Sequence, residues 1–228
     1  MHILFKVHHR LKDYKKVAEP PITGDMIDAQ GMVFLTAGFE TTANTLGSLM
    51  FHLATHPDIQ TKVYDEICDS IGPDEEVTHE TIQDLHYLEA CVLETLRIWP
   101  PIVERFRTCT NDCTIKGLKI KKGVLIKMPI YAAHFNDKFF PEPNKFMPDR
   151  FLKENADNII PYTWRPFGAG NRVCIGQRFA IMEIKIFVAK LLQKFKITKT
   201  TKTELKNPIG TYGMLTYPEI IVSLSSRH

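Results

Sequence analysis

Ten residues, FGAGNRVCIG (167–176), stand directly before a segment with strong helical periodicity and restrict the local fold more than any other stretch. Gly168, Gly170 and Gly176 allow the backbone to turn sharply and to come close to a bound group. Cys174 lies just before the helix start, where the positive end of the helix dipole and free N–H groups favour a thiolate. The loop is therefore a candidate site for a group that binds sulfur.

The neighbours of Cys174 narrow the choice of that group. Phe167 offers an apolar wall, and Arg172 offers a cation two residues from the sulfur. A large flat cofactor with a metal centre and carboxylate edges suits this combination, and haem is such a cofactor. A lone Gly-Cys-Gly region is more often a turn with a merely buried cysteine, but the full pattern F-x-x-G-x-R-x-C-x-G favours haem.

This pattern resembles the haem loop of the haem-thiolate monooxygenases of the cytochrome P-450 superfamily, and it matches at every fixed position from Phe167 to Gly176. The resemblance extends over nearly the whole chain. It is strongest with the broad-specificity vertebrate drug and steroid oxidases, through LATHPDIQTKV, YLEACVLETLR and PYTWRPFGAGNRVCIG. It implies haem b (iron protoporphyrin IX) with an axial thiolate from Cys174, and a mainly α fold with small β-sheets, the C-terminal portion of the cytochrome P-450 fold.

A second motif, AGFETTAN (37–44), interrupts the apolar face of a long predicted helix with Gly38, Glu40 and Thr41. Threonine can bond back to a carbonyl one turn earlier, and glycine permits distortion of the helix. A solvated acidic spot on an ordinary helix is the alternative interpretation. The resemblance implies that Glu40 and Thr41 relay protons to bound oxygen, with room left by Ala37 and Gly38.

The motif ETLR places Glu94 and Arg97 three residues apart on one helix face, a spacing that by itself is typical of a surface pair. The resemblance implies that Arg150 of PDRF joins them in a buried network. All three residues are then structural rather than catalytic.

The segment WPPIVERFR (99–107) follows that helix. The resemblance implies that Arg107 pairs with a haem propionate, a contact suited to a guanidinium fork. It also implies that Ile102 and Val103 contact the substrate, and their apolar side chains suit a lipophilic one.

Three other residues of types that can bind a metal, Cys109, Cys113 and His134, are more simply interpreted as structural residues. Cys109 and Cys113 in CTNDC have no second pair with zinc-site spacing, so we expect strand and turn cysteines without a metal. His134 is expected to be a hydrogen-bonded histidine under the core. An odd number of cysteines, five, spread along the chain favours a reducing compartment.

Apolar periodicity predicts helices over residues 26–56, 56–72 and 85–99, with Thr23 or Asp25 as a cap for the first. Alternation and turn residues predict a small sheet within 105–129 and a terminal hairpin within 210–226. A further amphipathic helix follows the cysteine loop, and its predicted apolar stripe consists of Ala180, Ile181, Ile184, Phe187, Val188, Leu191, Leu192 and Phe195.

Composition excludes several classes of protein. With 44% hydrophobic and 24% charged residues, the chain is expected to form a globular core rather than to be disordered. A net charge of +3 argues against a nucleic-acid surface built on bulk charge. The chain shows neither a membrane-spanning run nor a signal peptide.

Proteins of the family are much longer, so we interpret residues 1–228 as a partial cytochrome P-450 domain. It comprises an N-terminal basic segment (1–22) and a part with the helical core, haem loop and terminal hairpin (23–228). The full-length parent is expected at the cytosolic face of the endoplasmic reticulum membrane, held by an N-terminal anchor missing here. We expect the 228 residues alone to bind haem weakly and to hydroxylate nothing.

The function implied for the parent is insertion of one oxygen atom from O₂ into a lipophilic small molecule, such as a steroid, a fatty acid or a xenobiotic. Electrons from NADPH would arrive only through a flavoprotein reductase, with Arg178 and Lys185 as plausible contacts. A non-catalytic remnant that acts only by interaction is the alternative. A haem-thiolate isomerase is disfavoured, because its peroxide substrate needs no proton relay from Glu40 and Thr41.

Overall fold

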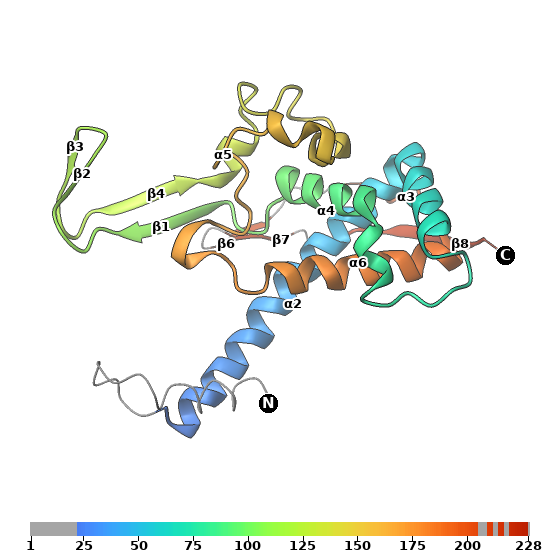
Figure 1. The fold of residues 1–228 in the computed structure, drawn as a ribbon, viewed down its shortest axis with the longest axis horizontal. Helices are drawn as coiled ribbons and strands as arrows, with labels where there is room; N and C mark the ends of the chain where they lie inside the picture. Colours follow the sequence, from blue (N-terminus) through green and yellow to red (C-terminus); the bar gives the residue numbers. More distant parts are fainter. Residues whose placement is uncertain (1–21, 205–208, 212–213, 217–218, 228) are drawn as a thin grey trace. The chain divides into compact units, whose positions relative to one another are not determined.

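The computed structural model describes residues 22–204, 209–211, 214–216 and 219–227 (Figure 1). The chain divides into two compact units, residues 1–41 and 42–228. The N-terminal basic segment expected over residues 1–22 lies outside the described residues, apart from Ile22. The mainly α architecture with small sheets is confirmed.

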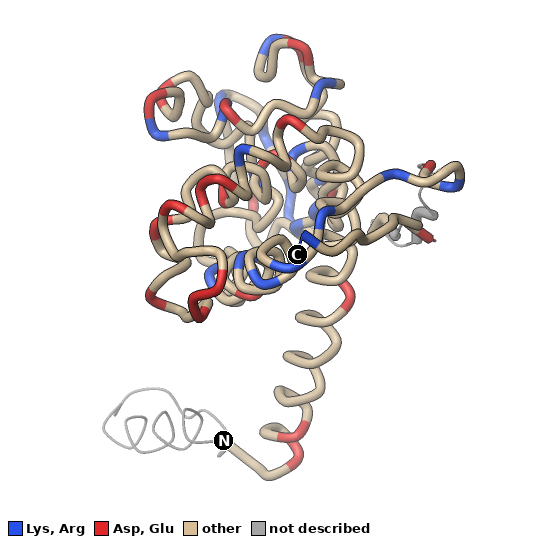
Figure 2. Tube along the Cα trace, turned by 90° about the vertical axis from the view of Figure 1, so that its right-hand side faces the viewer, with Lys and Arg blue, Asp and Glu red and all other residues tan. Residues whose placement is uncertain are grey.

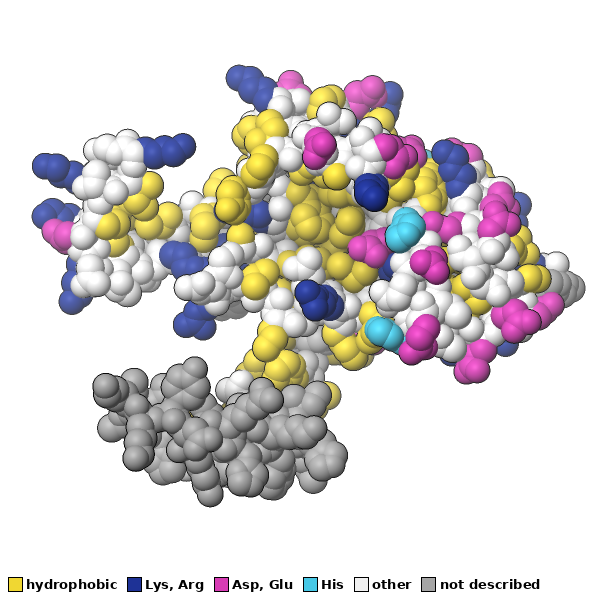
Figure 3. All heavy atoms as spheres, in the orientation of Figure 1, with side chains coloured by type: hydrophobic (Ala, Val, Ile, Leu, Met, Phe, Trp, Pro, Cys, Tyr) yellow, Lys and Arg dark blue, Asp and Glu magenta, His cyan; other side chains and the backbone are white. Residues whose placement is uncertain are grey.

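One long helix, α2 (Gly24–Thr55), contributes residues to both units. Thr23 caps it, because the Thr23 Oγ1 accepts a hydrogen bond from the Met26 N–H at 3.3 Å. Residues 24–41 contain no lysine or arginine, and this part is mostly tan in Figure 2 and largely yellow in Figure 3. Its largest apolar side chains are exposed: Met32, Val33, Phe34, Leu35 and Phe39.

The second unit has a helical core in which α3 (Pro57–Ser70), α4 (His86–Ile98) and α6 (Gln177–Lys194) pack against one another (Figure 1). Pro57 occupies the first position of α3, where its missing N–H has no cost. Gly72 follows the helix with a φ of +107°, a conformation that favours glycine. The fully buried apolar side chains of this core include Leu49, Leu53, Val63, Ile67, Leu85, Leu88, Val92, Val188 and Leu192.

The predicted apolar stripe of α6 is only partly right. Ile184, Val188 and Leu192 are buried as predicted, but Phe187 is 47% exposed. Gln193, a polar residue outside the predicted stripe, is buried instead. Its Nε2 donates to two carbonyl oxygens of the segment after α3, at 2.7 and 3.0 Å, and these bonds compensate for its removal from water.

A buried glutamine ties the helical core to the strand that follows α6. The Gln60 Nε2 donates to the Leu53 carbonyl at 2.8 Å and to the Ile197 carbonyl at 2.7 Å. The Ile197 N–H in turn donates to the Gln60 Oε1 at 2.9 Å. One side chain therefore satisfies backbone groups of two elements far apart in the sequence.

The sheet predicted within residues 105–129 consists of two antiparallel pairs. Strand β1 (Glu104–Thr108) pairs with β4 (Leu125–Pro129), and β2 (Cys113–Ile115) pairs with β3 (Leu118–Ile120). Lys116 and Gly117 turn the second pair with φ values of +47° and +83°. In Figure 1 the β2–β3 hairpin extends from the end of the β1–β4 ribbon.

The terminal hairpin predicted within residues 210–226 is only partly right. Strands β6 (Ile209–Thr211) and β7 (Met214–Thr216) form a hairpin. However, β8 (Val222–Ser226) pairs with β5 (Phe195–Lys199), the strand that directly follows α6. Turn residues marked the first pairing, but the second joins distant segments and has no local signal.

Short helices complete the fold: η1 (Thr81–Asp84), α5 (Ile130–His134), η2 (Pro148–Phe151), η3 (Lys153–Asn158) and η4 (Gly170–Arg172). No helix in the described part of the chain combines the length and the apolar character needed to cross a bilayer.

Candidate haem-thiolate site

The cysteine loop is closed by its own backbone. The Cys174 N–H donates to the Phe167 carbonyl at 2.9 Å, and the Val173 N–H donates to the Gly170 carbonyl at 3.0 Å. The Gly176 carbonyl then accepts from the Ala180 N–H at 2.9 Å within the first turn of α6. These bonds hold Cys174 at a fixed position just before the helix.

Two of the three predicted glycines are needed for their backbone conformation. Gly168 and Gly170 have φ values of +80° and +71°, in the left-handed region that disfavours other residues. Gly176 is different, because its φ is −88°. A Cβ at Gly176 would lie 3.9 Å from the Cys174 Sγ, an ordinary contact. Gly176 does lie in a turn, at residues 175–176, but the backbone there does not require glycine.

The side chains around the thiol form an exposed apolar surface. Cys174 is itself exposed, and Ile175, Phe179 and Val173 are 86%, 63% and 47% exposed. Phe167 is partly buried and packs against the core, so it does not extend this surface. A thiol amid uncovered apolar side chains fits haem, because the iron takes a sulfur ligand and the ring covers apolar area.

The two arginines predicted to meet haem carboxylates are both exposed. Arg172 ends η4, two residues before the thiol. Arg107 lies on β1, where its Nη1 donates to the Phe106 carbonyl at 2.8 Å. Both guanidinium groups are accessible to an anionic partner.

The predicted substrate contacts pack against strand β7 and against the first turn of α5. Ile102 forms an antiparallel bridge with Met214, and the Val103 carbonyl accepts from the Tyr131 N–H at 3.0 Å. Both Ile102 and Val103 are half-buried. Their position is therefore fixed by backbone contacts while part of each apolar side chain remains accessible.

The predicted proton-relay residues lie on α2, in the first unit. Thr41 bonds back along the helix as expected, since its Oγ1 donates to the Ala37 carbonyl at 2.7 Å. Glu40, Ala37 and Gly38 are exposed, and α2 continues through them without a break. These residues belong to a different unit from the cysteine loop.

The structure brings the three predicted network residues together. The Arg97 guanidinium donates to both carboxylate oxygens of Glu94, at 2.7 and 2.8 Å, and both side chains are 0% exposed. The Arg150 Nε lies 3.4 Å from the Glu94 Oε1, which also accepts from the Met147 N–H at 2.9 Å. The carboxylate is thus neutralised and hydrogen-bonded, as a buried charge requires.

His134 connects this network to the cysteine loop. The Arg97 Nη1 donates to the His134 carbonyl at 3.0 Å, and the His134 Nδ1 lies 3.0 Å from the Arg97 carbonyl. The Arg165 N–H, two residues before Phe167, donates to the His134 Nε2 at 3.1 Å. Burial lowers the pKa of His134 to about 4, so the ring is neutral and can accept this bond. Sequence reasoning predicted a hydrogen-bonded histidine but not this connection.

One predicted reductase contact is wrong. Lys185 is buried, and its Nζ pairs with the Glu89 carboxylate at 2.9 Å. Arg178, in contrast, is exposed on the first turn of α6. A lysine in α6 is expected at the surface from the local sequence alone. Its partner Glu89 lies on α4, far away in the sequence, so the local pattern could not indicate the ion pair.

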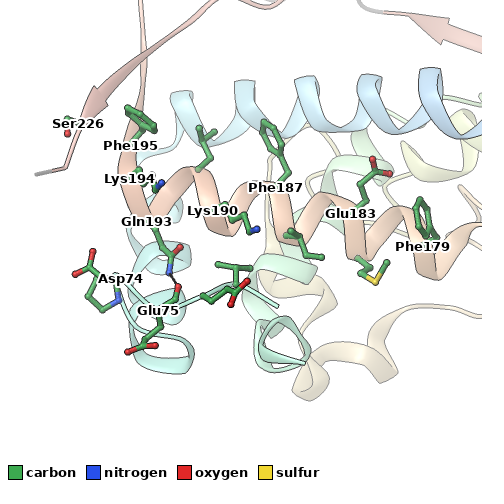
Figure 4. A pocket seen from close by; sticks show the side chains of 16 residues that line it. Asp74, Glu75, Phe179, Glu183, Phe187, Lys190, Gln193, Lys194, Phe195 and Ser226 are labelled. Atoms are coloured by element: carbon green, nitrogen blue, oxygen red, sulfur yellow. Dashed lines mark hydrogen bonds between the residues drawn. The ribbon is translucent and has the colours of Figure 1, made fainter. Parts of the chain in front are cut away.

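A groove of about 1140 Å³ runs along α6 and the segment after α3 (Figure 4). Phe179, Phe187 and Lys190 line it from α6, and Asp74 and Glu75 line it from the other segment. Cys174 is not among its lining residues, but Phe179 is, so the groove meets the apolar surface around the thiol at this one side chain.

The known proteins to which this chain is similar belong to one family. A family model described as Cytochrome P450 matches residues 6–222. Cytochrome P450 3A6 of Oryctolagus cuniculus and Cytochrome P450 3A7 of Homo sapiens are both 43% identical, and in each case the alignment covers 87% of this chain and 40% of the relative. Cytochrome P450 3A19 of Capra hircus aegagrus is 38% identical over 87% of this chain and 92% of its own sequence. This chain thus spans less than half the length of the first two relatives, and it belongs to the cytochrome P450 family.

Proposed function

We propose that Cys174 ligates the iron of haem b and that the parent protein is a monooxygenase of lipophilic small molecules. The observation that carries this proposal is the exposed thiol surrounded by exposed Val173, Ile175 and Phe179. A soluble surface rarely leaves such side chains grouped unless something covers them. When bound, haem supplies O₂ activation, which the electron-rich sulfur ligand promotes.

The loop residues hold and orient the group. Gly168 and Gly170, in left-handed conformations, keep side chains out of the path of a close-lying ring. Phe167 packs against the core and supports the loop from behind. Arg172 and Arg107 are exposed, and their guanidinium forks can each bind a propionate carboxylate.

Glu40 and Thr41 are proposed to deliver protons. The Thr41 hydroxyl donates to the Ala37 carbonyl, so its oxygen has a fixed direction along α2. To relay a proton, the hydroxyl would exchange its bond to the Ala37 carbonyl for one to the proton acceptor, and Glu40, the preceding residue of α2, would return a proton to the Thr41 oxygen. Ala37 and Gly38, with the smallest side chains, would leave space for oxygen next to the hydroxyl.

The remaining parts of the proposal concern the parent protein. Half-buried Ile102 and Val103 suit a steroid, a fatty acid or a xenobiotic as substrate. Electrons would come from NADPH through a flavoprotein reductase, with exposed Arg178 as one contact. The parent would lie at the cytosolic face of the endoplasmic reticulum membrane.

Haem titration of the full 228-residue chain tests the proposal. Because these 228 residues are expected to bind haem only weakly, a large excess of haem is used, and reduction with carbon monoxide should then give a red-shifted thiolate Soret band at low occupancy. Cys174→Ser should abolish this band, whereas Cys113→Ser, which removes another exposed thiol, should leave it unchanged. A thiolate band that survives Cys174→Ser would overturn the proposal.

A further inference from the structure

The hairpin region contains two thiols in near contact. The Sγ atoms of Cys109 and Cys113 lie 3.6 Å apart, at the junction of the two small sheets. We propose that this pair is a reversible modification site, which forms an intrachain disulfide by exchange with a low-molecular-weight disulfide of the glutathione type. The inference is independent of the haem site.

The backbone of Cys109 is fixed on one side of the junction. Its N–H donates to the Val124 carbonyl at 2.9 Å, and its carbonyl accepts from the Gly123 N–H at 2.7 Å. These bonds continue the β1–β4 pairing one residue beyond Thr108. Cys109 therefore behaves as a strand residue with a set position.

Cys113 is fixed on the other side. It is the first residue of β2 and pairs with Ile120 of β3. The preceding Asp112 anchors the turn, because its carboxylate accepts from the Lys122 N–H at 2.9 Å and from the Lys121 Nζ at 2.8 Å. The turn therefore keeps the two thiols close to each other in the folded chain.

The two sulfur atoms need to move only a short distance to form a bond. A disulfide bond is about 2.05 Å long, so the sulfurs must move closer by about 1.5 Å. Rotation about the Cα–Cβ bonds moves a sulfur by such amounts without any change in backbone pairing. The fold therefore accommodates both the reduced and the oxidised pair.

Exposure determines which thiol reacts first. Cys113 is exposed, whereas Cys109 is 9% exposed and its S–H donates to the Asn111 carbonyl at 2.9 Å. The hydrogen bond with Cys109 raises the pKa of the Cys113 thiol, with a further contribution from Asp112. Exchange should therefore begin at Cys113 and accelerate as the pH rises.

The proposed reaction balances in two steps. The Cys113 thiolate attacks oxidised glutathione, forms a mixed disulfide and releases one glutathione thiolate. The Cys109 thiolate then attacks the Cys113 sulfur and releases the second glutathione. Two protein thiols are oxidised by two electrons, and one glutathione disulfide is reduced to two thiols.

Metal binding is a weaker interpretation of the same pair. A structural zinc site needs four ligands. Within the described residues, no group of three or more His, Cys, Asp and Glu side chains is arranged to hold a metal. Both carboxylate oxygens of nearby Asp112 already accept hydrogen bonds. The pair is therefore suited to exchange rather than coordination.

Peptide mapping tests the proposal on the full chain. Trypsin cleavage after Arg107 and Lys116 releases residues 108–116, TCTNDCTIK, which contain both cysteines and no others. After incubation with oxidised glutathione and alkylation, this peptide should carry no alkyl group and should have lost two hydrogen atoms. Recovery of the peptide with two alkylated thiols, while Cys174 becomes glutathionylated, would overturn the proposal.

Matched variants separate the two steps. Cys109→Ser should trap glutathione on Cys113, and Cys113→Ser should leave Cys109 largely unmodified. The oxidised fraction of the pair in a glutathione redox buffer gives the equilibrium constant for disulfide formation. We expect this constant to be at least about tenfold larger for the folded chain than for the chain in concentrated urea. Equal constants would show that the fold does not assist the pair and would contradict the inference.

Discussion

The Glu94–Arg97 network is linked through His134 to the segment that leads into the Cys174 loop, but network and loop are opposite in their exposure to solvent. Glu94 and Arg97 are 0% exposed, and each Glu94 oxygen accepts hydrogen bonds from within the chain. In the loop the thiol is exposed and Ile175 is 86% exposed. The network is satisfied by the chain itself, whereas the loop presents apolar and sulfur surface to something outside the chain.

This difference separates a supporting role from a binding role. His134 joins the two regions, because it contacts the Arg97 carbonyl on one side and the Arg165 N–H on the other. Loss of a network side chain should therefore reduce stability, while loss of the Cys174 thiol should affect the binding of a ligand.

The largest effect is expected from Arg97→Ala. It leaves the Glu94 carboxylate buried without its bidentate partner, which typically costs about 3–5 kcal/mol of the free energy of unfolding. Urea unfolding followed by far-ultraviolet circular dichroism measures the loss. Glu142→Gln, which removes the exposed Lys145–Glu142 pair, is the control and should leave the midpoint unchanged. Equal midpoints for Arg97→Ala and the control would contradict the assigned role of the network.

The next effect is a pH dependence through His134. Its pKa is lowered from 6.5 to about 4, so the unfolded chain binds a proton more readily than the folded chain. The neutral ring stabilises the fold fully above pH 6.5, and this contribution is lost as the pH falls toward 4, by about 3 kcal/mol in total. Urea midpoints measured across this interval should decrease on acidification.

A variant isolates the histidine responsible. Burial also lowers the pKa of His52, which contributes to the same slope. His134→Asn should therefore be less stable than the natural chain at pH 7 but lose less stability between pH 6.5 and 4. An unchanged slope would assign the pH dependence to other groups.

A smaller effect compares two glycines of the loop. Gly170→Ala forces alanine into the left-handed region at φ +71°, which costs about 1–2 kcal/mol, although open space surrounds the new Cβ. Gly176→Ala, at φ −88°, should change stability much less. Urea unfolding of both variants checks this order. Equal losses would show that backbone conformation does not explain the glycine at position 170.

The smallest effect is expected from Lys185→Met. The Lys185 ammonium is buried but its partner Glu89 is 41% exposed, so removal of the lysine leaves no buried unpaired charge, and an apolar side chain should fill its place at little cost. Thermal unfolding should therefore show little loss. A loss of stability as large as that of Arg97→Ala would show that Lys185 is as important for the fold as the Glu94–Arg97 network.

Local features made part of this structure predictable. Proline and glycine mark the ends of α3, and Thr23 marks the start of α2, because these residues act through their own backbone or side chain within one turn. The positive φ values of Gly168 and Gly170 were predictable for the same reason, because glycine in a sharp turn acts through its own backbone. The resemblance supplied the burial of Glu94 and Arg97, since their spacing alone is typical of a surface pair.

Contacts between segments that are distant in the sequence could not be predicted. Lys185 is buried because Glu89 on α4 reaches it, and β8 pairs with β5 rather than within a terminal hairpin. Gln193 is buried because loop carbonyls accept its amide hydrogens. Each of these contacts joins segments far apart in sequence, so the local pattern contains no signal for it.

The Gln60 side chain acts as a substitute for a third strand beside β5. Its amide exchanges two hydrogen bonds with the N–H and C=O of Ile197, the same pair of bonds that a neighbouring strand residue would make. Ile197 faces Leu224 of β8 on its other side. The free edge of β5 is thereby already occupied at its centre, which protects this edge against pairing with a foreign strand.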